Sequence, residues 1–125
     1  MDALLSAMVQ MKASDLHLSA GNAPTVRHDG EMMPVPGCGI LSAADTERLL
    51  LSIATPRARE EFARRHDADF AYEIPGVGRF RGNLFMDRKG PGGVFRIIPT
   101  GILSAETLGL SQEVLDLCRL PKGLV

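Results

Sequence analysis

The sequence predicts an α+β domain with a mostly antiparallel sheet of about six strands and helices on its flank. Segments with a helical or strand pattern follow one another as a helix, three strands, two helices, three strands and further helices. Short turns join most neighbouring strands, which is the connection that antiparallel strands use. The 125 residues, 45% of them hydrophobic and 23% charged, are enough for one domain with its own core.

The first part of the chain is expected to form a helix and three strands. Leucines and methionines at a spacing near 3.6 predict a helix over residues 2–12. Strict alternation predicts a strand over 15–19, with Leu16 and Leu18 turned inward and Asp15, His17 and Ser19 turned outward. Two more strands, over 25–28 and 31–35, flank the dipeptide Asp29-Gly30, whose residues tolerate the positive φ of a tight hairpin turn.

Two helices are expected next, and each has a start signal. Ser42 and Asp45 have the spacing of a capping box, with Asp in place of the usual Glu. The residues expected to face the core from this helix are Leu49, Leu50 and Ile53. Thr55 as N-cap and Pro56 at the first helical position predict a second helix that runs to about His66. Its many charges are expected to form a solvated face.

The last part of the chain is expected to form three strands and two short helical pieces. The strands are predicted over 69–74, 78–86 and 93–99, with a glycine- and proline-rich reversal over 88–92. The helical pieces are predicted over 104–108 and 111–119, each beginning at a serine N-cap.

Arginines recur along the strands over 78–86 and 93–99. Alternation puts Arg79, Arg81 and Asn83 on one face of the first strand and Phe80, Leu84 and Met86 on the other. If the apolar faces of the two strands coincide, Arg81 and Arg96 lie nearly opposite each other. Like charges directly opposite on a sheet are unfavourable, so this pair needs an anion or a carboxylate nearby.

Two interpretations of the arginine face follow. The first is an anion-binding face. The second is an ordinary solvated face, because an arginine stem covers apolar surface while its head stays in water. In the second case the compensating carboxylate is expected from Asp69, Glu73 or Asp87.

Composition and missing motifs exclude several classes of protein. Fourteen Lys and Arg against fifteen Asp and Glu give a net charge of −1, which argues against nucleic acid as a partner. The two cysteines and three histidines have no metal-ligand spacing, so no metal site is expected. No membrane span or secretory signal is present, and a soluble cytoplasmic protein is expected.

No catalytic site is expected in this chain. It lacks a P-loop motif, and the glycine-rich segment over 90–93 leads into a strand instead of a helix. Ser14, Asp15 and His17 are near each other in sequence, but their order on a strand does not suit a catalytic triad.

Three stretches together resemble a known family. They are ASDLHLSAG over 13–21, followed by Pro24 and RHDG over 27–30; IPGVGRFRGN over 74–83; and GVFRIIP over 93–99. In this order and at this spacing they resemble the N-terminal domain of the twitching-motility (PilT-type) ATPases of the type II/IV secretion ATPase superfamily. Gly82 stands where that family usually has an apolar residue.

The resemblance implies a PAS-like domain over 1–99 and a helical linker over 100–125 that leads to a C-terminal ATPase domain. The family's members are cytoplasmic hexamers at the inner face of the inner membrane, which use ATP and Mg to retract type IV pili. The implied partners are the chain's own ATPase domain, neighbouring subunits of the homohexamer and the inner-membrane pilus platform. The isolated chain is expected to hold no cofactor.

The resemblance also implies roles for individual residues. Arginines of this domain reach the nucleotide phosphates in the family, and by position they fall among Arg79, Arg81 and Arg96. Asp15, His17 and Asn83 are expected at interdomain or intersubunit contacts. A guanidinium suits a phosphate because it donates two parallel hydrogen bonds.

A stand-alone PAS-like sensory module that binds a small ligand is the alternative. The sequence has one Tyr and no Trp, and it shows no convergent polar residues on the core faces, which argues against a cofactor pocket.

Overall fold

A single antiparallel sheet of six strands organises the chain. The computed structural model describes residues 1–101 and 103–123. The strand order is β3-β2-β1-β6-β5-β4, and each neighbouring pair is antiparallel. The strands are β1 (Asp15–Ser19), β2 (Thr25–His28), β3 (Glu31–Pro34), β4 (Asp67–Ile74), β5 (Gly78–Asp87) and β6 (Gly90–Ile98). The predicted fold class is confirmed.

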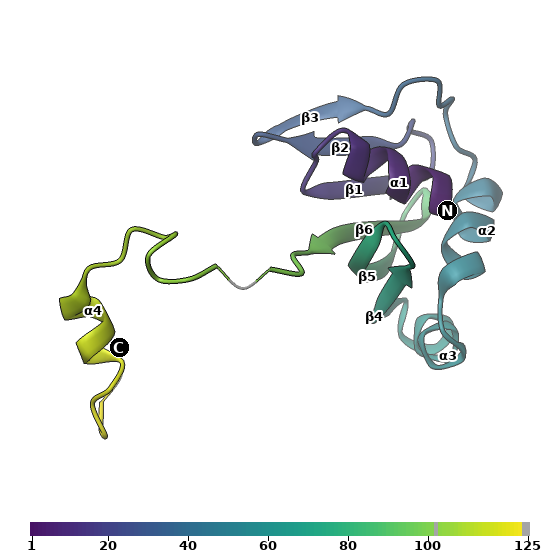
Figure 1. Ribbon diagram of the computed structural model, residues 1–125. Helices are drawn as coiled ribbons and strands as arrows, with labels where there is room; N and C mark the ends of the chain where they lie inside the picture. The colour runs from purple at the N-terminus through teal and green to yellow at the C-terminus, as the bar shows by residue number, and fades with distance from the viewer. Residues whose placement is uncertain (102, 124–125) are drawn as a thin grey trace.

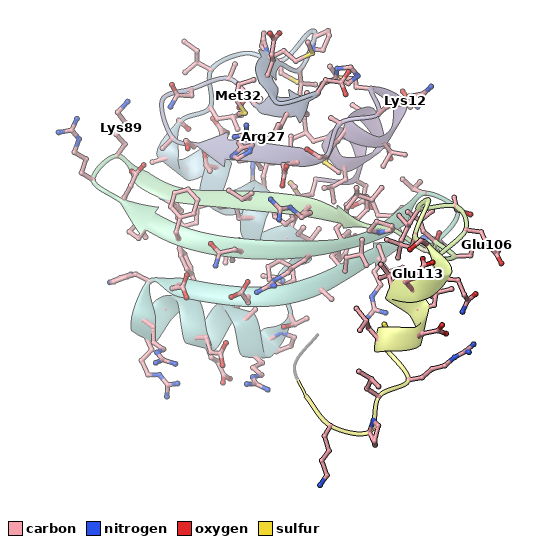
Figure 2. The ribbon with its side chains drawn as sticks, turned by 90° about the vertical axis from the view of Figure 1, so that its left-hand side faces the viewer. Lys12, Arg27, Met32, Lys89, Glu106 and Glu113 are labelled. Atoms are coloured by element: carbon pink, nitrogen blue, oxygen red, sulfur yellow. The ribbon has the colours of Figure 1, made fainter. Side chains whose placement is uncertain are left out.

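Three helices cover one face of this sheet: α1 (Asp2–Gln10), α2 (Ala43–Ile53) and α3 (Pro56–Arg65). Figure 1 shows α2 and α3 on the same side of the strands. The core between the layers joins Leu5 of α1, Leu50 of α2 and Phe62 of α3 to Phe80 and Phe95 of the sheet. The opposite face of the sheet carries the polar side chains and faces the viewer in Figure 2. This face is called the open face below.

Local sequence signals set the start of the two long helices and the first hairpin. Ser42 Oγ accepts a hydrogen bond from Asp45 N at 3.1 Å, and the reciprocal bond is present, so the capping box is confirmed. Thr55 caps α3 as predicted. Asp29 and Gly30 have φ values of 48° and 86°, which confirms the tight turn between β2 and β3.

The buried stripe of α2 differs from the prediction at two positions, 46 and 49. Thr46, Leu50 and Ile53 are buried, whereas Leu49 is half-buried. Thr46 can enter the core because its hydroxyl donates to the carbonyl of Ser42 at 2.9 Å, which satisfies the polar group without a partner outside the helix.

The hairpin between β5 and β6 is tighter than predicted. The expected loop over 88–92 shrinks to Arg88 and Lys89, because Asp87 pairs with Gly90. Asp87 Oδ1 accepts from the backbone N–H groups of Lys89 and Gly90 at 2.6 and 3.1 Å, and this carboxylate closes the turn. Pro91 fits inside β6 because the ladder between β1 and β6 ends at the neighbouring Gly92.

Other boundaries also move. β4 begins at Asp67, two residues before the predicted start, because its pairing with β5 extends to Phe85. The helix predicted over 2–12 ends at Gln10, and Lys12 has a positive φ of 53°.

Beyond β6 the chain extends away from the sheet to α4 (Gln112–Leu117) (Figure 1). The piece predicted as helical over 104–108 is a turn, in which Ser104 Oγ accepts from Thr107 N at 3.2 Å. Gly109, with φ +68°, follows it and stops any continuation as a helix. Leu124 and Val125, the end of the predicted linker, lie outside the described residues. No helix within 1–101 and 103–123 is long and apolar enough to span a membrane.

Candidate functional site

The β5–β6 hairpin sets two arginines directly opposite each other on the open face. Arg81 and Arg96 are partners in the register of the two strands, as the alternation predicted. Asn83 follows on the same face, opposite Val94, and Arg79 precedes, opposite Ile98. The predicted polar face is therefore confirmed as a geometric feature.

A hollow of about 300 Å³ lies around the arginine pair. The residues that line it are Asp15, Asp69, Arg81, Asn83, Val94 and Arg96. Arg79 is separate from this group: it lines another hollow, of about 420 Å³, near the turn between β4 and β5. The structure thus brings together two of the three predicted arginines and sets the third apart.

Arg96 is held by a buried carboxylate. Its Nε donates to Asp15 Oδ1 at 2.7 Å, across the β1–β6 pair. Ser14 Oγ donates to Asp15 Oδ2 at 2.7 Å, and Arg27 Nε lies 4.0 Å from the same oxygen. The Asp15 side chain is only 4% exposed, whereas that of Arg96 is 72% exposed. Asp15 was expected to point outward; it does lie on the open face, but the side chains around it bury it.

The surroundings of Asp15 keep it ionised. Burial alone raises the pKa of this carboxyl, but the hydrogen bonds from Ser14 and Arg96, with the charge of Arg96, outweigh burial and lower the pKa below its usual 3.8. Asp15 is therefore a carboxylate at neutral pH.

Arg81 has a weaker partner. Its Nη2 lies 3.5 Å from Asp69 Oδ1, and the two side chains are 70% and 51% exposed. An exposed pair at this distance stabilises a fold by less than about 1 kcal/mol. Asp69 is one of the three carboxylates that the sequence offered as a counter-charge. Of the other two, Asp87 closes the β5–β6 turn and Glu73 faces Arg79 in the register.

His17 and Asn83 occupy different surroundings on the open face. Asn83 Nδ2 donates to Asp67 Oδ1 at 3.0 Å and lines the arginine hollow. His17 instead lines a third hollow, with Thr25 and Met32 among its neighbours. Burial, with the charges of Arg27 and Arg96, lowers the pKa of His17 below 6.5 in spite of the opposing effect of Asp15, so its imidazole is neutral at pH 7.

The chemistry open to this site is recognition of an anion. Arg96 donates to Asp15 through Nε, so its two terminal Nη groups can donate to an oxyanion in the hollow. Arg81 offers a second guanidinium to the same oxyanion. Across the described ranges 1–101 and 103–123, no three His, Cys, Asp or Glu side chains gather as metal ligands do. The hollow therefore suits a phosphate or carboxylate better than a metal ion.

Sequence reasoning missed the pairing of Asp15 with Arg96. The two residues are 81 positions apart, and only the neighbouring positions of β1 and β6 join them. Alternation put both on polar faces, and that is the one signal that could have linked them.

Comparison with known proteins gives a consistent result. The type IV pilus retraction ATPase PilT of Pseudomonas aeruginosa is 38% identical over 122 residues, which cover 98% of this chain and 35% of the relative. The chain is a homologue of the type IV pilus ATPases. Among these ATPases, PilU of the same organism is 36% identical over 98% of this chain and 32% of its own length. A twitching motility protein of Neisseria gonorrhoeae is 31% identical over 82% of this chain and 27% of its own length.

The fold agrees with that of the pilus ATPases. The crystal structure of the pilus retraction motor PilT with bound ADP matches 90% of this chain and 33% of its own length, with a TM-score of 0.80 and 34% identity. The matching part of PilT is its N-terminal domain. This chain spans about a third of the length of the curated relatives it matches. No protein-family model matches the chain.

Proposed function

We propose that this chain is the N-terminal domain of an ATPase that retracts type IV pili and so drives twitching motility. In this proposal the domain packs on an ATPase domain and supplies arginine side chains to the phosphates of a bound ATP. Similarity to pilus ATPases along almost the whole chain supports the first part. The arginine pair on the open face, Arg81 opposite Arg96, is the observation that carries the second part.

The chemistry of guanidinium supports a role at phosphates. Arg remains charged at all working pH values, and its planar fork donates two parallel hydrogen bonds to adjacent oxygens. During phosphoryl transfer, negative charge spreads over the oxygens of the transferred group, and an arginine close to them stabilises that charge. Arg81 and Arg96 are 70% and 72% exposed, so both are accessible to a nucleotide held by another domain.

Arg79 belongs to the proposal as a third, separate contact. It is exposed at the start of β5, near Thr100, where the chain leaves the sheet, and its hollow is not that of Arg81 and Arg96. We assign it to a peripheral phosphate or interdomain contact. His17 and Asn83 are assigned to contacts with the ATPase domain or with a neighbouring subunit, because both lie on the open face.

The rest of the proposal concerns the parent protein. ATP is the group that the arginines would touch, and the donor set of two guanidiniums suits its phosphates. The described carboxylates of the hollow, Asp15 and Asp69, are each paired with an arginine, so Mg would be held with the nucleotide by other parts of the protein. A homohexamer at the cytoplasmic face of the inner membrane, working on the pilus platform, is the assembly we propose.

Steady-state ATP hydrolysis by the full-length protein tests the arginine assignment. We expect Arg81→Ala and Arg96→Ala to lower turnover at least about tenfold each, because one arginine aimed at a transferring phosphoryl group contributes this much or more. Arg57→Ala is the matched control, since Arg57 is exposed on α3, away from the open face, and its ion-pair partner is Glu61. Normal turnover in both variants, with subunit assembly unchanged by size-exclusion chromatography, would reject the assignment.

A further inference from the structure

We infer that Asp15 is a positioning residue for Arg96: its buried carboxylate holds the guanidinium by Nε, so that the terminal amino groups face the hollow. This inference rests on the proposed role of the arginine pair at phosphates. It adds that the two arginines are held differently, one in a fixed position and one loosely. It also gives Asp15 a role inside the domain and not at a contact surface.

The position of Asp15 in the sheet makes it an anchor. It lies on β1 between two arginines in the register, Arg27 on β2 and Arg96 on β6. A hydroxyl and a guanidinium donate one hydrogen bond each to its two oxygens, both at 2.7 Å. A charge-assisted bond of this length to a carboxylate that is 4% exposed restricts the arginine far more than an exposed pair does.

The pair across the hollow shows the contrast. Arg81 reaches Asp69 at 3.5 Å, and both side chains are more than half exposed. A long side chain with such a partner keeps most of its rotamer freedom, and binding a ligand then costs the entropy of ordering it. Arg96 loses part of that freedom on folding, so less ordering remains when an anion binds. Arg96 is the preorganised donor and Arg81 the adaptable one.

The charges of the hollow favour recognition of an anion through the orientation of the guanidinium N–H groups. Asp15 and Asp69 balance Arg81 and Arg96, so the hollow has no net formal charge. An anion would therefore be recognised by directed N–H groups more than by long-range attraction. The shape of the guanidinium then matters as much as its charge, and a lysine at position 96 would supply the charge without the fork.

A double-mutant cycle in the full-length ATPase tests the positioning role. We expect Asp15→Asn to lower kcat about tenfold while KM changes less than about threefold, because the lost alignment matters most as charge develops in the transition state. In an Arg96→Ala background the same substitution should have no further effect on kcat, since Asp15 acts through Arg96. Arg96→Lys should be as impaired as Arg96→Ala. The matched control is Glu61→Gln, which removes an arginine partner on α3 and should leave kcat unchanged.

Two results of the cycle would overturn the inference: an unchanged kcat in Asp15→Asn, or an equal loss with and without Arg96. A second measurement needs no substitution and no nucleotide. In the unmodified 125-residue chain, NMR should show the Nε–H of Arg96 exchanging with water at least about tenfold more slowly than those of Arg79 and Arg81. Exchange at the same rate for all three would reject the anchor. Because this measurement uses the unmodified chain, it decides the question even if Asp15→Asn does not fold.

The two proposals fail in different ways. If Arg81→Ala and Arg96→Ala both turn over ATP normally, the phosphate assignment is wrong, whatever the NMR measurement gives. If the arginine variants are inactive but the Arg96 Nε–H is not protected, the phosphate assignment stands and the anchor is wrong.

Discussion

Gly82 leaves room for two aromatic rings directly beneath the arginine face. A Cβ at this position would lie 2.7 Å from Phe95 Cε1 and 3.3 Å from Phe70 Cε1. The two rings pack edge to face, with centroids 6.2 Å apart and an interplanar angle of 79°. Gly82 faces the core between Arg81 and Asn83, so its missing side chain is what allows the rings to approach the strand. The absence of a side chain at position 82 therefore has a packing reason.

Substitution of Gly82 should destabilise the domain. We expect Gly82→Ala to lower the free energy of unfolding by about 1–3 kcal/mol, because the added methyl group overlaps the ring of Phe95 and forces the core to shift. Urea denaturation measures this loss. Gly39→Ala is the control, since a Cβ there meets nothing within 4 Å. Equal stability of the two variants would contradict the packing argument.

Asp15 should make the stability of the domain depend on acid pH. Because the pKa of Asp15 is lowered below 3.8 in the folded chain, the unfolded chain binds the proton more readily. The stabilisation from this carboxylate is complete well above pH 3.8 and is lost as the pH falls through the folded-state value. We expect Asp15→Asn to be less stable than the unmodified chain at pH 6 and the difference to shrink by pH 3, as followed by urea unfolding. A stability difference between the two chains that stays constant from pH 6 to pH 3 would show that the charge of Asp15 does not stabilise the domain.

At the scale of elements, helix starts are set by single side chains. The capping box of α2 satisfies the Asp45 N–H through Ser42, and Thr55 accepts from the N–H of Ala58 at the start of α3. Both helices pack on the same face of the sheet, so their start positions decide which residues enter the core. The register of Thr46, Leu50 and Ile53 toward the sheet follows from the start of α2.

Loss of the α2 cap should be measurable. We expect Ser42→Ala to lower the free energy of unfolding by about 1 kcal/mol, because the N–H of Asp45 loses its acceptor. Thermal or urea unfolding measures the change. Ser52→Ala on the same helix is the control: its hydroxyl donates to the carbonyl of Leu49 on an exposed surface, and its removal should change stability by less than about 0.5 kcal/mol. A Ser42→Ala variant as stable as this control would contradict the capping role.

At the scale of the whole molecule, the chain divides into a packed sheet domain and a segment with little burial. Large apolar side chains beyond β6 are exposed, namely Leu103, Leu108, Leu110, Val114, Leu117 and Leu120. Six exposed apolar side chains within residues 103–120 favour a partner surface that covers at least some of them. The helix α4 has six residues, too few to be stable in water without packing. We propose that the domain over 1–99 carries the stability and that the remainder is covered by another part of the parent protein.

A truncated chain tests this division. We expect residues 1–99 alone to unfold with a free energy within about 0.5 kcal/mol of that of the 125-residue chain, because every core residue in the described part of the chain comes from the first 99 positions. Amide hydrogen exchange on the longer chain should show protection in β1, β5 and β6 and little protection in α4. A loss of more than about 1 kcal/mol on truncation would mean that the segment after β6 stabilises the domain.

Much of the fold could be predicted because its signals are local. The capping box at Ser42, the Thr55-Pro56 start and the Asp29-Gly30 turn each act within four residues, and each was predicted from residue type alone. The predictions were wrong where a side-chain contact overrides the local signal and sets the boundary of an element. The β5–β6 turn is shorter than predicted because the carboxylate of Asp87 closes it, and glycine and proline content by itself had favoured a longer loop.

The amino-acid sequence alone determined the antiparallel α+β class, the faces of the strands and the placement of Arg81 and Arg96 on one polar surface. Alternation has a period of two residues and carries no information about which strands become neighbours. Only the tertiary structure placed β6 between β1 and β5, and with it the buried Asp15 against Arg96. How firmly Arg96 is held therefore depends on strand order, because Asp15 and Arg96 come from opposite ends of the domain. Arg81 instead meets Asp69 from the adjacent strand of the β4–β5 hairpin.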